Sequence, residues 1–132
     1  MTTVETVLSR EGFDVAELPG DFDLVAELRR VNEQHGHRGA PCWFLYRRDE
    51  FPGLTVGVHG ERGALYWDDL DAPAIPAHGT NAEHVDYFTG GVHHYTFPPS
   101  AELPLEHVFS AVAEFVRTGQ RPTCVEWNEH NA

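Results

Sequence analysis

The spacing of apolar residues near the end of the chain predicts an α-helix with both ends marked. Between Leu105 and Val116, apolar side chains recur at the i, i+3, i+4, i+7 and i+11 positions, which places one stripe of a helix against a core. Pro104 suits the first turn, where its missing N–H costs nothing. Gly119 supplies the left-handed residue that ends a helix.

A second amphipathic stripe occurs in the first third of the chain. It follows Pro19-Gly20-Asp21, and Asp21 is the expected N-cap. The apolar positions that form the buried stripe, up to Gly36, are Phe22, Val25, Leu28 and Val31. The sequence therefore predicts two helices.

Runs rich in aromatic and β-branched residues predict the strands. The expected antiparallel meander consists of Cys42–Arg47, Leu54–Val58 and Ala64–Asp68, and the expected hairpin of Val85–Phe88 and His94–Phe97. Early strands are expected at Val4–Leu8 and Phe13–Leu18, although Val4–Arg10 also fits the start of a helix, and a closing strand at Thr123–Trp127. Residues 69–82 have no period and many Pro, Ala and Gly residues, which is typical of a long surface loop.

These elements predict an α+β fold with a mainly antiparallel sheet and two helices packed on one face, because hairpin spacings dominate and helical crossovers are few. A chain of 132 residues lies in the usual range for a single domain, here residues 1–132. The face of the sheet opposite the helices would be partly exposed. If it carries aromatic and acidic residues, it is the expected place for a partner.

The charge of the chain is strongly acidic. Nine arginines and no lysine stand against 21 Asp and Glu residues, a formal net charge of −12, and no cation occurs between Gly63 and Val116. Such a field repels phosphate backbones and anionic lipids and attracts basic proteins. We therefore expect neither nucleic acid nor a membrane as a partner. Acidity alone is also common in proteins that need only solubility.

Several motifs together resemble the Imm-one family of immunity proteins from bacterial polymorphic toxin systems. They are Gly63-Ala64-Leu65-Tyr66-Trp67-Asp68, the Pro-bounded helix after Pro104, the T-G-x-R-P turn at 118–122 and the final V-x-W at 125–127. The resemblance covers the last half to two-thirds of the chain. It implies a small cytoplasmic antidote that binds one cognate toxin domain, often a nuclease or nucleic-acid deaminase, and neutralises it without chemistry.

Charge and resemblance together predict the residues that contact the toxin. A toxin that acts on nucleic acid presents a cationic groove, and acidic side chains around aromatic anchors suit such a partner. The predicted contact residues are Trp67, Asp68, Asp69, Asp71, Asp86, Glu126 and Trp127. Tyr66 and Trp67 alternate along a strand, so one of the two is expected in the core.

Nine histidines raise an enzymatic alternative. A small metal-dependent or cupin-like enzyme would use His35, His37, His93 and His94, although His93 and His94 point to opposite faces of a strand. A third possibility is a non-catalytic protein whose family resemblance is only structural. We expect no cofactor, metal or catalytic residue, since neither the cysteines nor Ser110 with His107 lies in a nucleophile motif.

The start of the chain has no basic segment followed by an apolar one, so it does not predict a secreted precursor. No apolar run approaches the length of a membrane span. A cytoplasmic protein is therefore expected, with Cys42 and Cys124 kept reduced as small buried residues within strands.

Overall fold

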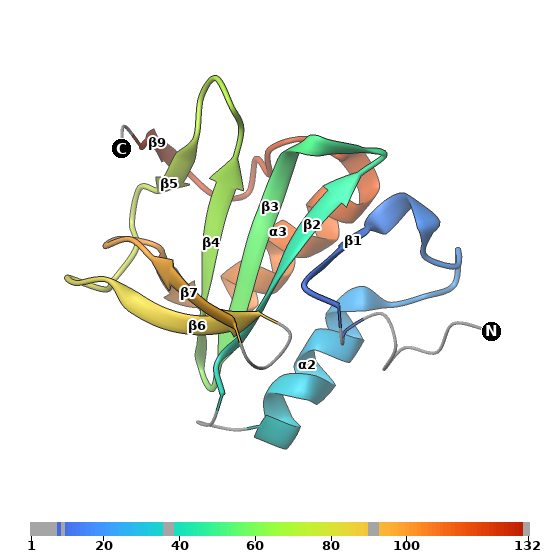
Figure 1. The fold of residues 1–132 in the computed structure, drawn as a ribbon, viewed down its shortest axis with the longest axis horizontal. Helices are drawn as coiled ribbons and strands as arrows, with labels where there is room; N and C mark the ends of the chain where they lie inside the picture. Colours follow the sequence, from blue (N-terminus) through green and yellow to red (C-terminus); the bar gives the residue numbers. More distant parts are fainter. Residues whose placement is uncertain (1–7, 9, 36–38, 90–92, 131–132) are drawn as a thin grey trace.

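The computed structural model describes residues 8, 10–35, 39–89 and 93–130 of the chain, and its architecture is α+β (Figure 1). The helices are α2 (Leu24–His35), α3 (Leu105–Thr118) and the short 3₁₀ helix η1 (Val15–Glu17). The strands are β1 (Gly12–Asp14), β2 (Pro41–Arg47), β3 (Asp49–His59), β4 (Arg62–Asp68), β5 (Ala74–Pro76), β6 (Val85–Thr89), β7 (His93–Phe97), β8 (Glu102–Pro104) and β9 (Trp127–Glu129).

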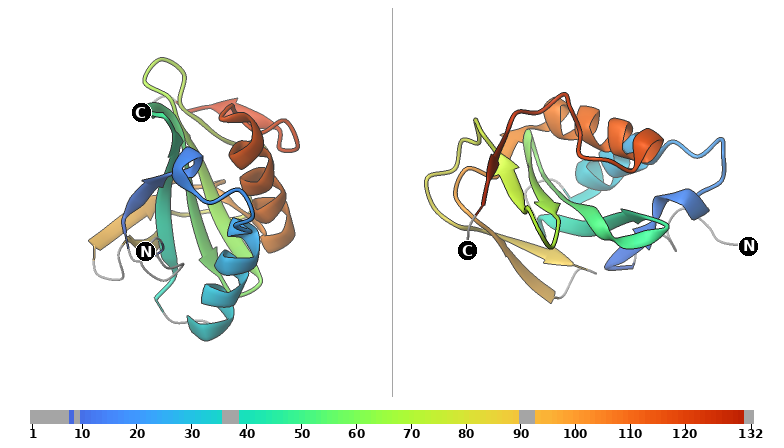
Figure 2. Two further views of the ribbon diagram at one scale, coloured as in Figure 1. Left: turned by 90° about the vertical axis from the view of Figure 1, so that its right-hand side faces the viewer. Right: turned by 90° about the horizontal axis from the view of Figure 1, so that it is seen from above.

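One sheet contains all these strands, in the order β7-β6-β2-β3-β4-β5-β9, with β1 beside β2 and β8 beside β4. The predicted meander is confirmed, because β2, β3 and β4 pair antiparallel in sequence order. The β6 and β7 strands also pair antiparallel, as predicted. Two pairings are parallel: Pro41–Cys42 of β2 lie beside β6, and the next part of the same strand lies beside β1. The β6–β7 hairpin thus joins the sheet at β2, through the parallel pairing of β6 with β2. In Figures 1 and 2 it lies on the opposite side of the central strands from α3.

Several predicted boundaries are wrong for identifiable reasons. The strand expected at 13–18 is cut short at Asp14, because the Asp14 carboxylate accepts the Ala16 N–H and starts η1. Residues 69–82 are not all loop, since Ala74–Pro76 form β5 between β4 and β9. The closing strand is Trp127–Glu129 rather than 123–127. The segment expected as a strand or helix at 4–8 lies, except for Leu8, outside the described residues.

The two helices form where the stripes predicted them. Helix α3 ends as expected at Gly119, whose φ of 68° is left-handed, and Arg47 donates to the carbonyls of Val116 and Arg117 at that end. Helix α2 starts later than expected, because the Asp23 carboxylate, not Asp21, accepts the N–H of Ala26.

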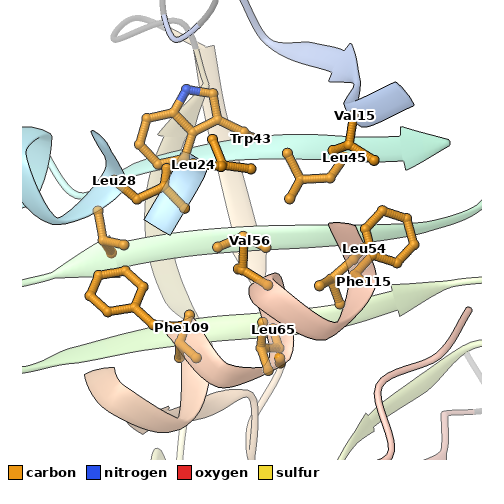
Figure 3. Packing of buried hydrophobic residues seen from close by; sticks show 14 of the residues in the cluster. Val15, Leu24, Leu28, Trp43, Leu45, Leu54, Val56, Leu65, Phe109 and Phe115 are labelled. Atoms are coloured by element: carbon orange, nitrogen blue, oxygen red, sulfur yellow. The ribbon is translucent and has the colours of Figure 1, made fainter. Parts of the chain in front are cut away.

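Side chains of both helices enter one hydrophobic cluster with the central strands (Figure 3). Trp43 and Leu45 of β2 pack there with Leu28 of α2 and Phe109 and Phe115 of α3. In β3 and β4 the cluster takes every second residue, namely Leu54, Val56, Val58, Leu65 and Trp67. The other residues of these strands therefore face away from the cluster.

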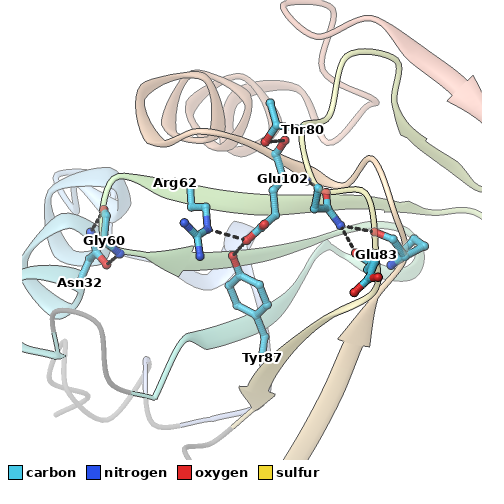
Figure 4. A network of polar contacts seen from close by, with 9 residues as sticks. Asn32, Gly60, Arg62, Thr80, Glu83, Tyr87 and Glu102 are labelled. Atoms are coloured by element: carbon cyan, nitrogen blue, oxygen red, sulfur yellow. Dashed lines mark hydrogen bonds and ion pairs between the residues drawn. The ribbon is translucent and has the colours of Figure 1, made fainter.

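A smaller cluster and a polar network hold the β6–β7 hairpin. Tyr87 packs edge-on against Phe97 at 5.0 Å, and its hydroxyl donates to the buried Glu102 carboxylate at 2.8 Å. Arg62 pairs with the same carboxylate at 3.1 Å (Figure 4). Burial and the carboxylate raise the pKa of Tyr87, so the phenol stays a donor. The network fixes the hairpin to the start of β4.

Substitution of Val112 tests the contribution of α3 to the core. Its side chain is fully buried, so Val112→Ala is expected to lower the free energy of unfolding by about 1–3 kcal/mol through lost contacts and a small cavity. Urea denaturation measures this change. The half-buried Val116 provides the comparison, because Val116→Ala should cost less; equal costs would contradict the burial described here.

Candidate partner-binding surface

The central strands carry a distinct set of side chains on the face that points away from the main cluster. Tyr46 of β2, Gly53 of β3 and Asp68 of β4 pair in one row across the sheet. Phe44, Thr55 and Tyr66 form the next row. Between residues 53 and 57 the middle strand contributes only small residues to this face, because Gly57 follows at the next alternate position. In both rows β2 and β4 therefore carry aromatic or charged side chains, and β3 carries a small residue between them.

An open groove of about 380 Å³ lies over residues 53–55 of β3. Tyr46, Thr55 and Phe51 are among its lining residues. The ionisable groups in its lining, apart from Tyr46, are the carboxylates of Glu11, Glu50 and Asp68. We call this feature the acidic groove. No cation is among its lining residues in the described part of the chain, so a positively charged group is the complementary ligand.

Two large apolar side chains are exposed, and one of them lines the groove. Among the described residues, the large hydrophobic side chains that are exposed are Phe51 at 37% and Leu70 at 76%. Phe51 lines the groove, and Leu70 follows Asp68 by two positions in the β4–β5 connection. An apolar anchor among polar neighbours is typical of a protein–protein contact.

The carboxylate of Asp68 is the electrostatic centre of this surface. Partial burial, followed by the charges of Glu50 and Asp69, raises its pKa. Burial and the charge of Asp68 also raise the pKa of Tyr66, and they raise the pKa of Tyr95 to about 12. The negative potential at Asp68 thus reaches two phenols, which stay protonated as hydrogen-bond donors.

Comparison with known families gives a match over most of the chain: the model described as immunity protein Imm1 matches residues 14–129. The chain belongs to the Imm1 family of immunity proteins. This confirms the resemblance, and the match reaches into the amino-terminal third, where no motif had been recognised. A search of curated proteins found no match. Within the described part of this Imm1 protein, no helix is long and apolar enough to cross a membrane.

The structure brings together part of the predicted contact set. Asp68, Asp69 and Asp71 lie at the end of β4 and in the connection that follows it, and the Asp69 carboxylate accepts the Asp71 N–H at 3.0 Å. Glu126 and Trp127 lie across β5 from β4, where Pro76 pairs with Trp127. The Trp127 indole is half-buried and donates to the Pro122 carbonyl.

Trp67 and Asp86 lie elsewhere. Trp67 is only 3% exposed and packs edge-on to Phe115 with 6.0 Å between ring centroids, so its indole belongs to the core and we leave it out of the surface. Tyr66, its alternate neighbour, is the partly exposed residue of the pair. Asp86 lies on the β6–β7 hairpin and contacts His94 at 2.6 Å.

The histidines of the enzymatic alternative do not converge where they are described. His93 contacts Glu11 at 3.4 Å, whereas His94 contacts Asp86. His37 and the side chain of His35 lie outside the described residues. In the rest of the chain no three His, Cys, Asp or Glu side chains are placed to hold a metal ion.

The candidate nucleophiles have other surroundings. Cys42 is buried as expected, and burial raises its pKa to about 12, so the thiol does not ionise at neutral pH. Cys124 is exposed, contrary to the prediction, because the strand expected around it does not form. The Ser110 hydroxyl donates to the Glu106 carbonyl one turn earlier in α3, which is a common helix contact.

Sequence reasoning missed Glu50, Phe51 and Leu70. The sequence predicts a turn around Phe51 and a loop around Leu70, whereas Phe51 lies in β3. The available signal was the alternation in β2 and β4, where Trp43, Leu45, Leu65 and Trp67 alternate with the aromatic and acidic residues Phe44, Tyr46, Tyr66 and Asp68. That alternation shows that two faces exist, but not which neighbouring strand supplies the remaining wall.

Proposed function

We propose that this Imm1 protein is a non-enzymatic, cytoplasmic antidote that binds a cognate nuclease or deaminase domain of a polymorphic toxin system and occludes its cationic surface. The observation that carries the proposal is the acidic groove with the exposed Phe51 in its lining. A family whose members are immunity proteins makes a toxin the natural partner.

The proposed arrangement assigns different tasks to the two faces of the sheet. Both helices cover one face and build the core, while the acidic groove and the β4–β5 connection meet the toxin. Asp68, Asp69, Asp71 and Glu50 supply the charge, and Leu70 an apolar contact. Glu126 and Trp127 extend the surface across β5, and Asp86 belongs to its outer part on the hairpin.

Charge is the physical basis of inhibition in this proposal. A domain that acts on nucleic acid must present Arg and Lys side chains to phosphates. A carboxylate-lined surface competes for the same side chains and excludes the substrate while it is bound. No acid–base or nucleophilic group is required, which agrees with the surroundings of the cysteines and Ser110.

Co-expression with the toxin domain encoded beside this gene tests the proposed function. Cells that make the toxin alone should stop growing, and cells that also make this protein should grow, with the two proteins co-purifying as a complex. Growth arrest despite folded, abundant protein would contradict the proposal. A toxin with its catalytic residue removed provides the control, because both cultures should then grow.

Salt should slow formation of the complex more than it changes its dissociation. Long-range attraction between an acidic surface and a basic partner is screened by ions, so the association rate constant should fall about 10-fold or more from low to high salt. Stopped-flow fluorescence measures both rates. An association rate that is indifferent to salt would show that charge does not guide the encounter.

A further inference from the structure

The floor of the acidic groove is made of backbone and small side chains. On the sheet face that points away from the main cluster, β3 presents Gly53, Thr55 and Gly57 in succession. A side chain could not be added at the two glycines, because a Cβ would lie 2.7 Å from the Leu45 carbonyl oxygen at Gly53 and 2.5 Å from the Tyr87 ring at Gly57. Tyr87 therefore fills the Gly57 end of this valley, and the Gly53–Thr55 end is the acidic groove.

Asp68 stands at the side of this open end without a counter-charge. It pairs in register with Gly53, so the residue directly opposite it on β3 has no side chain. Its electrostatic neighbours are Glu50 and Asp69. In the described residues, no hydrogen bond or ion pair involves the Asp68 carboxylate. A half-buried carboxylate among like charges is costly until a cation reaches it.

Thr55 provides a second, independent indication of a ligand. Its side chain is completely buried, yet Oγ1 has no hydrogen-bond partner of ordinary geometry among the described residues. The Tyr95 phenol lies close enough for the Thr55 hydroxyl to lower the pKa of Tyr95. The two groups do not form a hydrogen bond of ordinary geometry, so Oγ1 keeps no partner among the described residues. Unsatisfied buried hydroxyls are rare, and one in the floor of a groove is a site for a donor.

The aromatic walls restrict what that donor is. Phe44 and Tyr46 of β2 line the groove beside Thr55, and Tyr95 packs edge-on to Phe44 at 5.3 Å. A planar cation stacks on aromatic rings while it donates several hydrogen bonds in its plane. A guanidinium carries a positive charge, stacks on aromatic rings and donates several hydrogen bonds, whereas an ammonium is compact and strongly hydrated.

We infer that the acidic groove is a receptor for one arginine side chain of the partner, whose guanidinium stacks on the rings of Phe44 and Tyr46, pairs with Asp68 and donates to Thr55. This inference rests on the proposed function for the partner's identity as a toxin, but it concerns a site of this chain that is testable without the toxin.

Titration with small probes tests the receptor directly. Isotope-labelled protein is titrated with N-acetyl-arginine amide and followed by NMR at the Asp68 carboxyl and the Thr55 amide. We expect saturable shifts with a dissociation constant in the millimolar range, weaker ones with N-acetyl-lysine amide, and none with the neutral citrulline analogue. Equal responses to arginine and citrulline, equal responses to arginine and lysine, or no response to arginine would each overturn the inference.

Two variants separate this role from a structural one. Asp68→Asn should abolish the arginine response, whereas Asp71→Asn, an equal change of charge on an exposed side chain, should leave it nearly unchanged. Thr55→Val keeps the shape and removes the unsatisfied hydroxyl, so it should leave the melting temperature unchanged or higher while it weakens the arginine response. A melting temperature that falls together with the response would mean that Thr55 is only structural.

Binding to the catalytically inactive toxin domain completes the test. Asp68→Asn should weaken that complex about 30-fold or more, the usual effect of losing one member of a desolvated charge pair, and Asp71→Asn only a few-fold. If wild-type protein fails to protect cells, the proposed function is wrong even where arginine binds. If it protects and Asp68→Asn binds as well as Asp71→Asn, the arginine receptor is wrong and the proposed function stands.

Discussion

Cells that co-express the toxin with the Asp68→Lys, Asp69→Lys, Asp71→Lys variant are expected to lose protection. Each substitution removes an attraction to a cationic partner and adds a repulsion, and like charges at an interface cost several kcal/mol. The three together should weaken binding by at least about 4 kcal/mol, roughly a thousandfold. The fold should survive, because the main local loss is the Asp69–Asp71 turn contact, Asp71 is exposed and the half-buried Asp68 carboxylate has only like charges as its electrostatic neighbours.

A matched variant isolates position from net charge. Asp21→Lys, Glu33→Lys, Glu61→Lys changes the charge equally at exposed residues that do not line the groove. It should slow association somewhat and keep full protection. Isothermal titration and a melting curve for both variants provide the measurement. If the first variant still rescues cells, the β4–β5 acidic segment is an ordinary solvated surface and the interface lies elsewhere.

Trp67→Ala is expected to give the largest loss of stability. The indole is buried against Phe115, and removal of so large a side chain leaves a cavity that costs about 3–5 kcal/mol. A loss of that size is a large fraction of the stability of a typical domain. Protection should therefore fail at high growth temperature, where the variant unfolds, and return at low temperature, where enough of it is folded.

Trp67→Phe distinguishes a core role from a contact role. Phenylalanine refills most of the space, so the variant should lose less stability than Trp67→Ala, and its affinity for the toxin should equal that of the wild type. Thermal denaturation with binding measured well below the melting temperature tests both points. Normal stability with weakened binding would place Trp67 in the interface, as the sequence alone had suggested.

The sequence predicted the elements whose residues carry a clear period. Helix α3 was bounded correctly because Pro104 and Gly119 mark its ends. The strands β2 and β4 were placed close to their observed bounds because apolar residues alternate within them, whereas β3 begins at Asp49, well before the predicted Leu54–Val58. Asp21 was mistaken for the cap of α2 because Asp21 and Asp23 are both good caps, and only the backbone geometry chooses between them.

The short strands could not be predicted, because three residues carry no measurable period. The β5 strand forms since β4 and β9 supply hydrogen bonds on both sides of it, a property of the assembled sheet and not of Ala74–Pro76. The candidate site was likewise predictable only where a local sequence pattern marks its residues. Asp68, Asp69 and Asp71 were found from charge, whereas Glu50 and Phe51 reach the groove through a strand pairing that no local pattern reveals.

The alternation of residues along β2 and β4 allows the proposed partner-binding face to be changed independently of the main hydrophobic cluster. Phe44, Tyr46, Tyr66 and Asp68 stand on one side of a backbone whose other side is filled by Trp43, Leu45, Leu65 and Trp67. A library that varies Phe44, Tyr46 and Asp68 leaves the main cluster untouched, whereas Tyr66 also packs on the smaller cluster and is kept. Gly53 leaves the groove open beside these residues. Such a library is a direct route to antidotes with new partner preferences on an unchanged scaffold.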